Sequence, residues 1–477
     1  MVAYNPLASV RQGWLILAVF SLSVETLEAQ PCGGYAITDL GTLCASDCCY
    51  ATFALGCSDP ACEQAICKVD PFCCDGAWDE ICAQQANELC EICGPTNECE
   101  TSFFDFSSGV AINEAGQIAG FSRPSDFFTI SGAWFWEDGV LTALPHLRGD
   151  NGSTAADING VGQVMGTSTA DILVTGYTAV VWCNRGGTWV ANPVFTPQVS
   201  HGAAINNSGQ MAGWNASDFC PDPEHRGWRL PGGFLPSLEV GGESEALGIN
   251  EQDKVVGHSQ TAAGDCSWPY QAVMWSESGT ITNLGTLGGE NSTAHALNDA
   301  TQVVGASEFN DTCCDRHAFL WLPEPAFGLP SGLNDLGTFG GDRSFAYGIN
   351  DFGWIVGQAY HANGEDHAFL WVGGDMLDLN DLISPDSGWV LRRANDINNQ
   401  RQIVGRGITD GQFRAFLLTP LPCQADLNDD CVVNAADLAL LLGAWGPGPG
   451  NPADLNDDDV VNAFDLAMLL GAWGPCE

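Results

Sequence analysis

The chain has 477 residues, of which 59 are acidic and 15 are basic, for a formal net charge of −44. A surface this acidic repels phosphate backbones and anionic lipid headgroups. Neither nucleic acid nor a membrane surface is therefore an expected partner. Hydrophobic residues make up 45% of the chain and 57 residues are glycine, which indicates several domains with hydrophobic cores and many turns.

Residues 1–29 have the organisation of a signal peptide. Arg11 provides the positive charge, the run WLILAVFSLSV (14–24) provides the short apolar segment, and cleavage is expected after Ala29. The apolar run is too short to span a bilayer, and no other stretch could span one. We therefore expect an exported protein, secreted or held at the cell surface, with no membrane insertion.

Residues 35–43 (YAITDLGTL) form a predicted β-strand, which is followed by a cysteine-rich insert at 44–100. Of the 21 cysteines, 13 lie within 32–99, a density typical of disulfides in exported proteins. The odd total leaves at least one cysteine unpaired or bonded between molecules. Apolar residues at helical intervals in 78–90 predict a small disulfide-rich helical unit, with metal ligation as the alternative. The pieces GCSDPAC, DPFCCD and WDEIC resemble a cysteine-rich module of exported bacterial proteins.

Residues 101–420 contain seven copies of the core Ile-Asn-x-x-Gly-x-Val-x-Gly. Each core is followed by an apolar run such as HAFLW and then by a segment such as NDLGTFGG. Every repeat therefore predicts four short strands, here named a, b, c and d, and four strands in such a length make one propeller blade. The asparagines recur every 44 to 52 residues, at Asn113, Asn159, Asn206, Asn250, Asn298, Asn350 and Asn398.

The repeated residues are those that strands and turns require. The asparagine side chain can cap the a–b turn, and the glycine three positions later accepts a positive φ. The last glycine of the core is expected to end strand b where backbones approach closely. We therefore interpret the repeats as structural and predict no catalytic residue in them. His317 and His367 share one repeated position before strand c, so the same interpretation applies to both.

The ends of the repeat array predict closure. The seventh repeat stops after strand c (414–420), while 35–43 is a d-type strand without a repeat of its own. The N-terminal strand can complete the last blade and remove the exposed edges. We predict a mainly β chain with a seven-bladed β-propeller of four-stranded blades; an open β-solenoid is the alternative.

LGTLGG, the Ile-Asn core and HAFLW resemble the HAF-type extracellular repeat family over 35–43 and 101–420. This resemblance implies an exported β-rich protein and no particular chemistry.

The C-terminal segment 424–477 contains a duplicated acidic loop, at 426–437 and again at 454–465. Oxygen-bearing side chains at loop positions 1, 3, 5, 9 and 12, with a backbone carbonyl at position 7, are the ligands that Ca²⁺ prefers. We predict two Ca²⁺ ions, with an acidic solvated loop as the alternative. The predicted ligands are Asp426, Asn428, Asp430, Val432, Asn434 and Asp437 in the first loop, and Asp454, Asn456, Asp458, Val460, Asn462 and Asp465 in the second.

Each loop is followed by an apolar helix, and the doubled unit resembles the type I dockerin family over 424–474. The resemblance implies an all-α calcium-binding module that docks onto a cohesin-like protein. Two features depart from the family pattern. Loop position 6, usually glycine in the family, is Cys431 in the first loop and Asp459 in the second. Positions 10 and 11, where the family has polar pairs that recognise a cohesin, are Ala-Ala (435–436) and Ala-Phe (463–464).

No GxSxG, HExxH or phosphate-loop pattern is present. We therefore predict a non-catalytic extracellular binding or scaffold protein with calcium-dependent docking, whose partner is a cohesin-like or cell-surface protein, or a glycan. The alternative is a component of polysaccharide degradation, either glycan-binding or a glycoside hydrolase. The b–c loops carry Cys220, Cys266, Cys313 and Cys314, and the cysteine-rich insert joins strands d and a, so we expect the working face at that end of the blades.

Overall fold

The computed structural model describes residues 34–43, 66, 68, 106–123, 131–170, 176–194, 199–215, 225–262, 269–309, 315–421, 424–428, 432–456 and 458–475. The predicted signal peptide, all of the cysteine-rich insert except residues 66 and 68, and the b–c loop cysteines lie outside these residues. Cys183 is the one cysteine in the described part, and it forms no disulfide. No helix described is long and apolar enough to cross a membrane.

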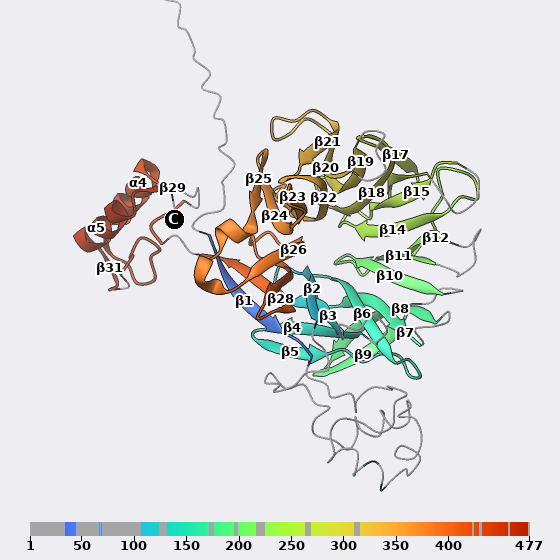
Figure 1. Cartoon of the computed structure of the whole chain (residues 1–477). Coiled ribbons are helices and arrows are strands. Elements are labelled where there is room, and N and C mark those ends of the chain that lie inside the picture. Colours follow the sequence, from blue (N-terminus) through green and yellow to red (C-terminus); the bar gives the residue numbers. More distant parts are fainter. Residues whose placement is uncertain are drawn as a thin grey trace, which may run out of the picture.

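The strands form consecutive four-stranded antiparallel units, which we call blades and which follow one another around the molecule (Figure 1). Blade 1 holds β2 (Phe106–Ile112), β3 (Ile118–Arg123), β4 (Gly132–Glu137) and β5 (Val140–Ala143), and blade 2 holds β6 (Gly152–Ile158), β7 (Val164–Thr169), β8 (Tyr177–Arg185) and β9 (Thr188–Pro193). Blade 3 holds β10 (Ser200–Ile205), β11 (Met211–Asn215), β12 (Arg226–Leu230) and β13 (Gly233–Phe234), and blade 4 holds β14 (Ser244–Ile249), β15 (Val255–Gln260), β16 (Tyr270–Trp275) and β17 (Ile281–Gly285).

Blade 5 holds β18 (Gly288–Leu297), β19 (Val303–Phe309), β20 (Arg316–Leu322) and β21 (Gly332–Gly337), and blade 6 holds β22 (Gly340–Ile349), β23 (Ile355–His361), β24 (Asp366–Val372) and β25 (Asp375–Asp378). The 3₁₀ turns η3 (Leu379–Leu382) and η4 (Pro385–Ser387) precede β26 (Val390–Ile397), β27 (Ile403–Thr409) and β28 (Gln412–Pro420) of blade 7. The prediction of a mainly β chain built from four-stranded antiparallel sheets is confirmed, and the arrangement is typical of a β-propeller.

β1 (Tyr35–Gly41) is the fourth strand of blade 7. It pairs antiparallel with β28, with Tyr35 opposite Pro420 and Asp39 opposite Phe416. This is the pairing that the sequence predicts for 35–43. A single parallel bridge between Phe106 and Phe413 then joins β28 of blade 7 to β2 of blade 1.

The hydrophobic core lies between neighbouring sheets. In one layer, Ala119 and Phe135 of blade 1 pack with Ile158 and Trp182 of blade 2. Burying such aromatic side chains removes a large apolar area from water and so drives the sheets together. Every strand c carries a fully buried aromatic residue, which is Trp134, Trp182, Trp228, Trp275, Phe319, Phe369 or Phe416.

The repeated asparagines cap the a–b turns as predicted. Asn250 is an example, because its Oδ1 accepts the backbone N–H groups of Gln252 and Lys254 at 3.1 and 3.0 Å. The third residue after the asparagine has a positive φ, as expected, and it is Asp253, Thr301 or Arg401 where it is not glycine.

The same side chains make a second contact that the sequence does not reveal. The Nδ2 of each buried asparagine donates to the backbone carbonyl of the corresponding asparagine in the next blade, at 3.0 to 3.2 Å. The last bond of this series runs from Asn398 back to Asn113. A buried serine at the start of strand a adds another link, since the Ala415 N–H of blade 7 donates to Ser107 Oγ of blade 1 at 2.9 Å.

The last glycine of each core lies inside strand b, so the expectation that it ends the strand is wrong. Gly257 pairs with Ala246, and the register of the partner strand then shifts before Gly248. A β-bulge in strand a therefore sits opposite the glycine. A Cβ at Gly257 would press on the Glu245 carbonyl, which is the close backbone approach that the sequence does predict.

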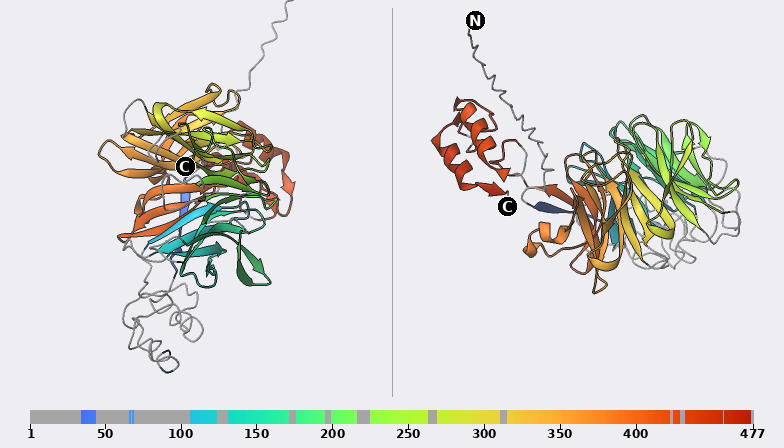
Figure 2. Two further views of the ribbon diagram at one scale, coloured as in Figure 1. Left: turned by 90° about the vertical axis from the view of Figure 1, so that its right-hand side faces the viewer. Right: turned by 90° about the horizontal axis from the view of Figure 1, so that it is seen from above.

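The C-terminal segment contains α4 (Ala435–Gly443) and α5 (Ala463–Gly471), which lie apart from the blades in Figures 1 and 2. It is not purely helical, because the ends of the two halves cross over. β29 (Val432–Val433) pairs with β32 (Gly474–Pro475), and β30 (Gly446–Pro447) pairs with β31 (Val460–Val461). Each loop is thus tied to the segment after the other half's helix, and a small common core forms around Leu441 and Leu469.

Candidate functional site

Side chains that the repeat does not require gather at one end of the blades. In an antiparallel sheet the start of strand a, the end of strand b and the start of strand c share one edge, which we call the b–c end. Aromatic and imidazole rings pack against one another there in several blades. Stacked pairs are His201 with Trp214, Phe309 with His317, Phe339 with His361, and Phe106 with Phe121. Tilted pairs are Tyr177 with His201, His258 with Tyr270, and Phe106 with Phe413.

A pocket of about 190 Å³ opens at this end between blades 3 and 4, lined by His225, Glu243, Glu245, His258, Gln260, Pro269 and Tyr270. His225 Nε2 lies 2.9 Å from Glu245 Oε1. Burial alone would raise the pKa of Glu245, but the His225 hydrogen bond and nearby histidines hold it below its usual value. Burial also lowers the pKa of His258. The pocket therefore combines an ionised carboxylate, a hydrogen-bonding imidazole and an aromatic wall.

Arginines lie over aromatic rings at this end and in the middle of neighbouring strands. Arg123 and Arg406 lie 4.5 and 5.5 Å from the centre of the Phe106 ring at the b–c end, and Arg393, which pairs with Arg406 in mid-strand, lies 3.6 Å from that of Tyr347. Burial and then the neighbouring Arg393 lower the pKa of Arg406. Two guanidinium groups thus lie over the Phe106 ring, where blades 7 and 1 meet.

Asp157 and Asp396 occupy the same position of strand a in blades 2 and 7. Each accepts one N–H from its own blade and one from the next blade; for Asp157 the donors are Ile158 and Ile205, at 2.8 and 2.7 Å. Burial raises the pKa of each carboxyl group to about 7 despite these bonds. Most other blades have glycine or alanine at this position, so neither carboxylate is demanded by the repeat.

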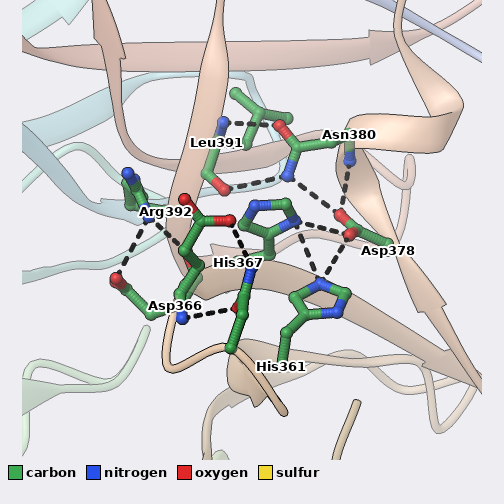
Figure 3. Close-up of polar contacts among 9 residues, drawn as sticks. His361, Asp366, His367, Asp378, Asn380, Leu391 and Arg392 are labelled. Carbon is green, nitrogen blue, oxygen red and sulfur yellow. Dashed lines mark hydrogen bonds and ion pairs between the residues drawn. The ribbon is translucent and has the colours of Figure 1, made fainter. Parts of the chain in front are cut away.

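A compact polar cluster lies at the b–c end of blade 6 (Figure 3). His361 ends β23, His367 is the second residue of β24, and Asp378 ends β25. His367 Nδ1 lies 2.6 Å from Asp378 Oδ2, while His361 Nε2 lies 3.2 Å from both atoms. In the part of the chain that the structure describes, no other group of three His, Cys, Asp or Glu side chains is as close as this one.

The cluster is held in place by its surroundings. Asn380 donates to Asp378 Oδ1 from both its backbone N and its Nδ2, each at 2.9 Å, and its Oδ1 accepts the Leu391 N–H. These bonds turn Asp378 Oδ2 toward the histidines. Burial would raise the pKa of Asp378, but the His367 and Asn380 hydrogen bonds hold it below its usual value. The ring of Phe339 stacks on His361 with their centres 4.8 Å apart.

Strand register identifies the corresponding residues in neighbouring blades. In blade 5 they are Phe309, His317 and Asp335, with His317 Nδ1 at 3.0 Å from the aspartate. From sequence, His317 and His367 share one repeated position and received the same structural interpretation, whereas His361 carried no prediction. An alignment of the repeats could have found it, because His361 stands where blade 5 has phenylalanine.

In the second predicted calcium loop, hydrogen bonds connect several of the predicted ligand residues. Asp458 N–H contacts Asp454 Oδ1 and Asn456 Oδ1 at 3.2 Å each, and Asn462 Nδ2 donates to the Val460 carbonyl at 2.8 Å. Asp465 is buried at the start of α5, where Oδ1 accepts the Leu455 N–H and Oδ2 the Asn462 N–H. Hydrogen bonds to these backbone groups hold the pKa of Asp465 below its usual value, against the effect of burial.

The first loop repeats this pattern where it is described. Asp437 is fully buried and accepts the Leu427 and Asn434 N–H groups at 2.8 Å each. Asp426 is also buried, Asn428 is exposed, and Val432 lies in β29. Asp430 and Cys431 lie outside the described residues. At position 6 of the second loop, Asp459 has a φ of 67°, the left-handed conformation in which glycine is usual.

No protein-family model matches the chain, and no curated protein does. Among solved structures, it is similar to the β-propeller domain of the Trilobed protease from Pyrococcus furiosus, with 11% identity, a TM-score of 0.42, and 66% of this chain and 95% of that chain covered. It is also similar to a gluconolactonase from Xanthomonas campestris (10% identity, TM-score 0.31, 67% and 88% covered) and to Trypanosoma rangeli sialidase (7%, 0.32, 87% and 61%). Likeness this distant carries no argument about a ligand or a reaction.

Proposed function

We propose that the chain is an extracellular, non-catalytic binding and scaffold protein whose propeller closes at seven blades. Closure is supported by three contacts between blades 7 and 1: the Asn398–Asn113 bond, the Ala415–Ser107 bond and the Phe106–Phe413 bridge. The pairing of β1 with β28 gives blade 7 its fourth strand. A closed ring leaves only the short outer edges of the blades unpaired and holds all b–c ends on one face.

One observation carries the binding role: the paired rings, the guanidinium groups of Arg123 and Arg406 over Phe106, and the polar pocket lie at the b–c end. Aromatic faces next to carboxylate, imidazole and guanidinium groups suit a ligand with apolar faces and many hydroxyl or acidic groups. Carbohydrate has that chemistry, so we propose a glycan, with an acidic sugar favoured by Arg123 and Arg406. The acidic remainder of the surface would repel such a ligand from other sites.

The C-terminal segment is proposed as a calcium-dependent docking module. This proposal is supported by hydrogen bonds that connect Asp454, Asn456, Asp458 and Asn462 in the second loop, because a cation bound there would relieve the repulsion among their oxygens. Exposed apolar residues recur at equivalent positions of the two helical halves, which is the property expected of a surface that binds a protein partner. They are Leu440, Leu442 and Trp445 in the first half, and Met468, Leu470 and Trp473 in the second. The HAF-type and dockerin-like resemblances point in the same direction, toward a cohesin-like or other cell-surface partner.

A glycan array probed with the full chain tests the proposed function. The array should retain the chain on an oligosaccharide, with acidic sugars preferred. Tyr270→Ala should weaken retention of the preferred glycan at least about fivefold, since losing an aromatic contact costs more than about 1 kcal/mol. Phe352→Ala is the matched control, because Phe352 is an exposed aromatic residue on the opposite, a–b turn end. Absence of any glycan binding, or equal losses in both variants, would contradict the proposed binding face. Release of shortened products would instead support the polysaccharide-degradation alternative.

A further inference from the structure

We propose that His361, His367 and Asp378 bind a divalent transition-metal ion, with Zn²⁺ as the preferred ion, at the b–c end of blade 6. Two imidazole nitrogens and one carboxylate oxygen form a donor set that zinc prefers over the all-oxygen sets of calcium and magnesium. The site is separate from the two calcium loops.

The distances fit one shared ion. Ligands about 2.0–2.1 Å from a tetrahedral zinc ion lie about 3.3 Å from one another. Two of the three distances between donor atoms in the cluster are 3.2 Å, and the third, between His367 and Asp378, is 2.6 Å. Only that last pair has to separate, by well under 1 Å, for a tetrahedral site to form. This lies within the reach of side-chain rotation on strand ends.

The surroundings are those of a metal site rather than of a simple ion pair. A ligating carboxylate needs one oxygen free for the ion and the other anchored, and Asn380 anchors Asp378 Oδ1 through two hydrogen bonds. Stacking against Phe339 fixes the ring of His361. Without an ion, three atoms compete for protons: if His361 Nε2 and His367 Nδ1 both donate to Asp378 Oδ2, the two N–H groups face each other at 3.2 Å.

The cluster is accessible enough to receive an ion. The side chain of His361 is 34% exposed, that of His367 is 21% exposed and that of Asp378 is 13% exposed. Three protein ligands leave a fourth tetrahedral position, which water or a ligand atom would fill. Its position at the b–c end places the ion on the face where the glycan is proposed to bind.

The neighbouring blade supplies a natural control. Blade 5 conserves the histidine–aspartate pair as His317 and Asp335 but has Phe309 in place of His361. His361→Phe therefore gives blade 6 the residue set that the same fold already tolerates one blade away. We expect this substitution to remove the metal site without disturbing the blade.

Zinc binding to the full chain tests the inference. The protein is stripped with a chelator, returned to buffer containing Ca²⁺ to fill the C-terminal loops, and titrated with Zn²⁺ against a chromophoric competitor. Wild type should bind one zinc ion more than His361→Phe or Asp378→Asn. Asn380→Ala should keep the ion but bind it about 10–100-fold more weakly. His317→Gln and Asp335→Asn should bind as wild type does.

Cobalt(II) identifies the ligands of the ion that is lost. The difference spectrum between wild type and His361→Phe should have visible d–d bands of a tetrahedral site and no sulfur-to-metal charge-transfer band, which distinguishes this cluster from cysteine ligation. Far-ultraviolet circular dichroism without metal checks that each variant is folded, and Asp378→Asn replaces His361→Phe if the latter is not. Equal zinc stoichiometry in wild type and both variants, or a lost site with thiolate absorption, would overturn the proposal.

Discussion

Asn398 Nδ2 donates to the backbone carbonyl of Asn113 at 3.1 Å, although 285 residues separate the two asparagines. Both side chains are buried. The bond repeats, between the last and first blades, the contact that joins every earlier pair of neighbours. A single side chain thus caps its own turn through Oδ1 and connects two blades through Nδ2.

This double role predicts a large cost for changing Asn398. Asn398→Ala removes the acceptor for the Gln402 N–H and the donor to the Asn113 carbonyl, which keeps the Gly116 N–H as its other partner. Each lost hydrogen bond costs about 0.5–1.5 kcal/mol. We expect the free energy of unfolding in urea to fall by about 2 kcal/mol. A loss below about 0.5 kcal/mol would mean that the ring of asparagines does not stabilise the fold.

Asn398→Asp separates the two contacts. The variant keeps an oxygen to cap its turn, but it places a carboxylate oxygen against the Asn113 carbonyl. We expect it to be destabilised above the pKa of the new carboxyl group and to recover part of the loss in acid. Identical stability of the Asp and Ala variants at every pH would show that the link to blade 1 is not the important contact.

Asp157 predicts a pH dependence of stability. Burial raises the pKa of Asp157 to about 7 in the folded chain, from the ordinary value of 3.8 that applies to the unfolded chain. The folded state therefore binds the proton more tightly than the unfolded state does. The stabilisation is fully present below about pH 4 and is lost as the pH rises through about 7. The difference in unfolding free energy between wild type and Asp157→Asn should therefore fall across that range, by at most about 1.4 kcal/mol per pH unit.

Asp396→Asn is an independent repetition of this experiment in blade 7, because burial raises the pKa of Asp396 to the same value. Differences that stay flat with pH for both variants would show that neither carboxyl group is protonated preferentially in the folded chain. If the stability of wild type relative to either variant increased with pH, the carboxyl group would have a lowered rather than a raised pKa in the folded chain.

The left-handed conformation of Thr301 predicts that glycine is tolerated better than alanine at this turn position. It has a φ of 64° at the turn position that is glycine in several other blades, and its hydroxyl accepts a hydrogen bond from Lys254 Nζ. Thr301→Gly should be more stable than Thr301→Ala by about 1 kcal/mol, because both lose the hydroxyl and only alanine keeps the strained Cβ. Equal thermal midpoints for the two variants would contradict the left-handed turn.

The crossed pairing of the C-terminal halves predicts coupling between the calcium loops. Asp465→Ala should abolish binding in the second loop, and because Val461 pairs with Gly446 it should also weaken the first. Isothermal titration of the full chain should find two Ca²⁺ ions in wild type and at most one, bound more weakly, in the variant. Two ions bound with unchanged affinity would refute the ligand assignment.

The sequence revealed the parts of this structure that repeat. The turn-capping role of the asparagines and the pairing of 35–43 with the last blade follow from copies that align with one another. It did not reveal the Asn398–Asn113 bond, because nothing in a repeat states what lies in the next blade. The glycines were predicted at the ends of the b strands but lie inside them. The β-bulge opposite each glycine could not be predicted, because a bulge does not change the pattern of apolar residues. His361 was missed for the opposite reason. It differs from the residues that the other repeats have at its position, and the prediction relied on residues that the repeats share.

Closure of the ring is the claim on which the shared b–c face depends, and native-state hydrogen exchange of the full chain tests it most directly. If β1 completes blade 7, the backbone amides of Tyr35–Gly41 should exchange as slowly as those of β28, and both segments should lose protection together as urea is added. Exchange of 35–41 at the rate of an unstructured peptide, while β28 stays protected, would contradict the closed seven-bladed propeller.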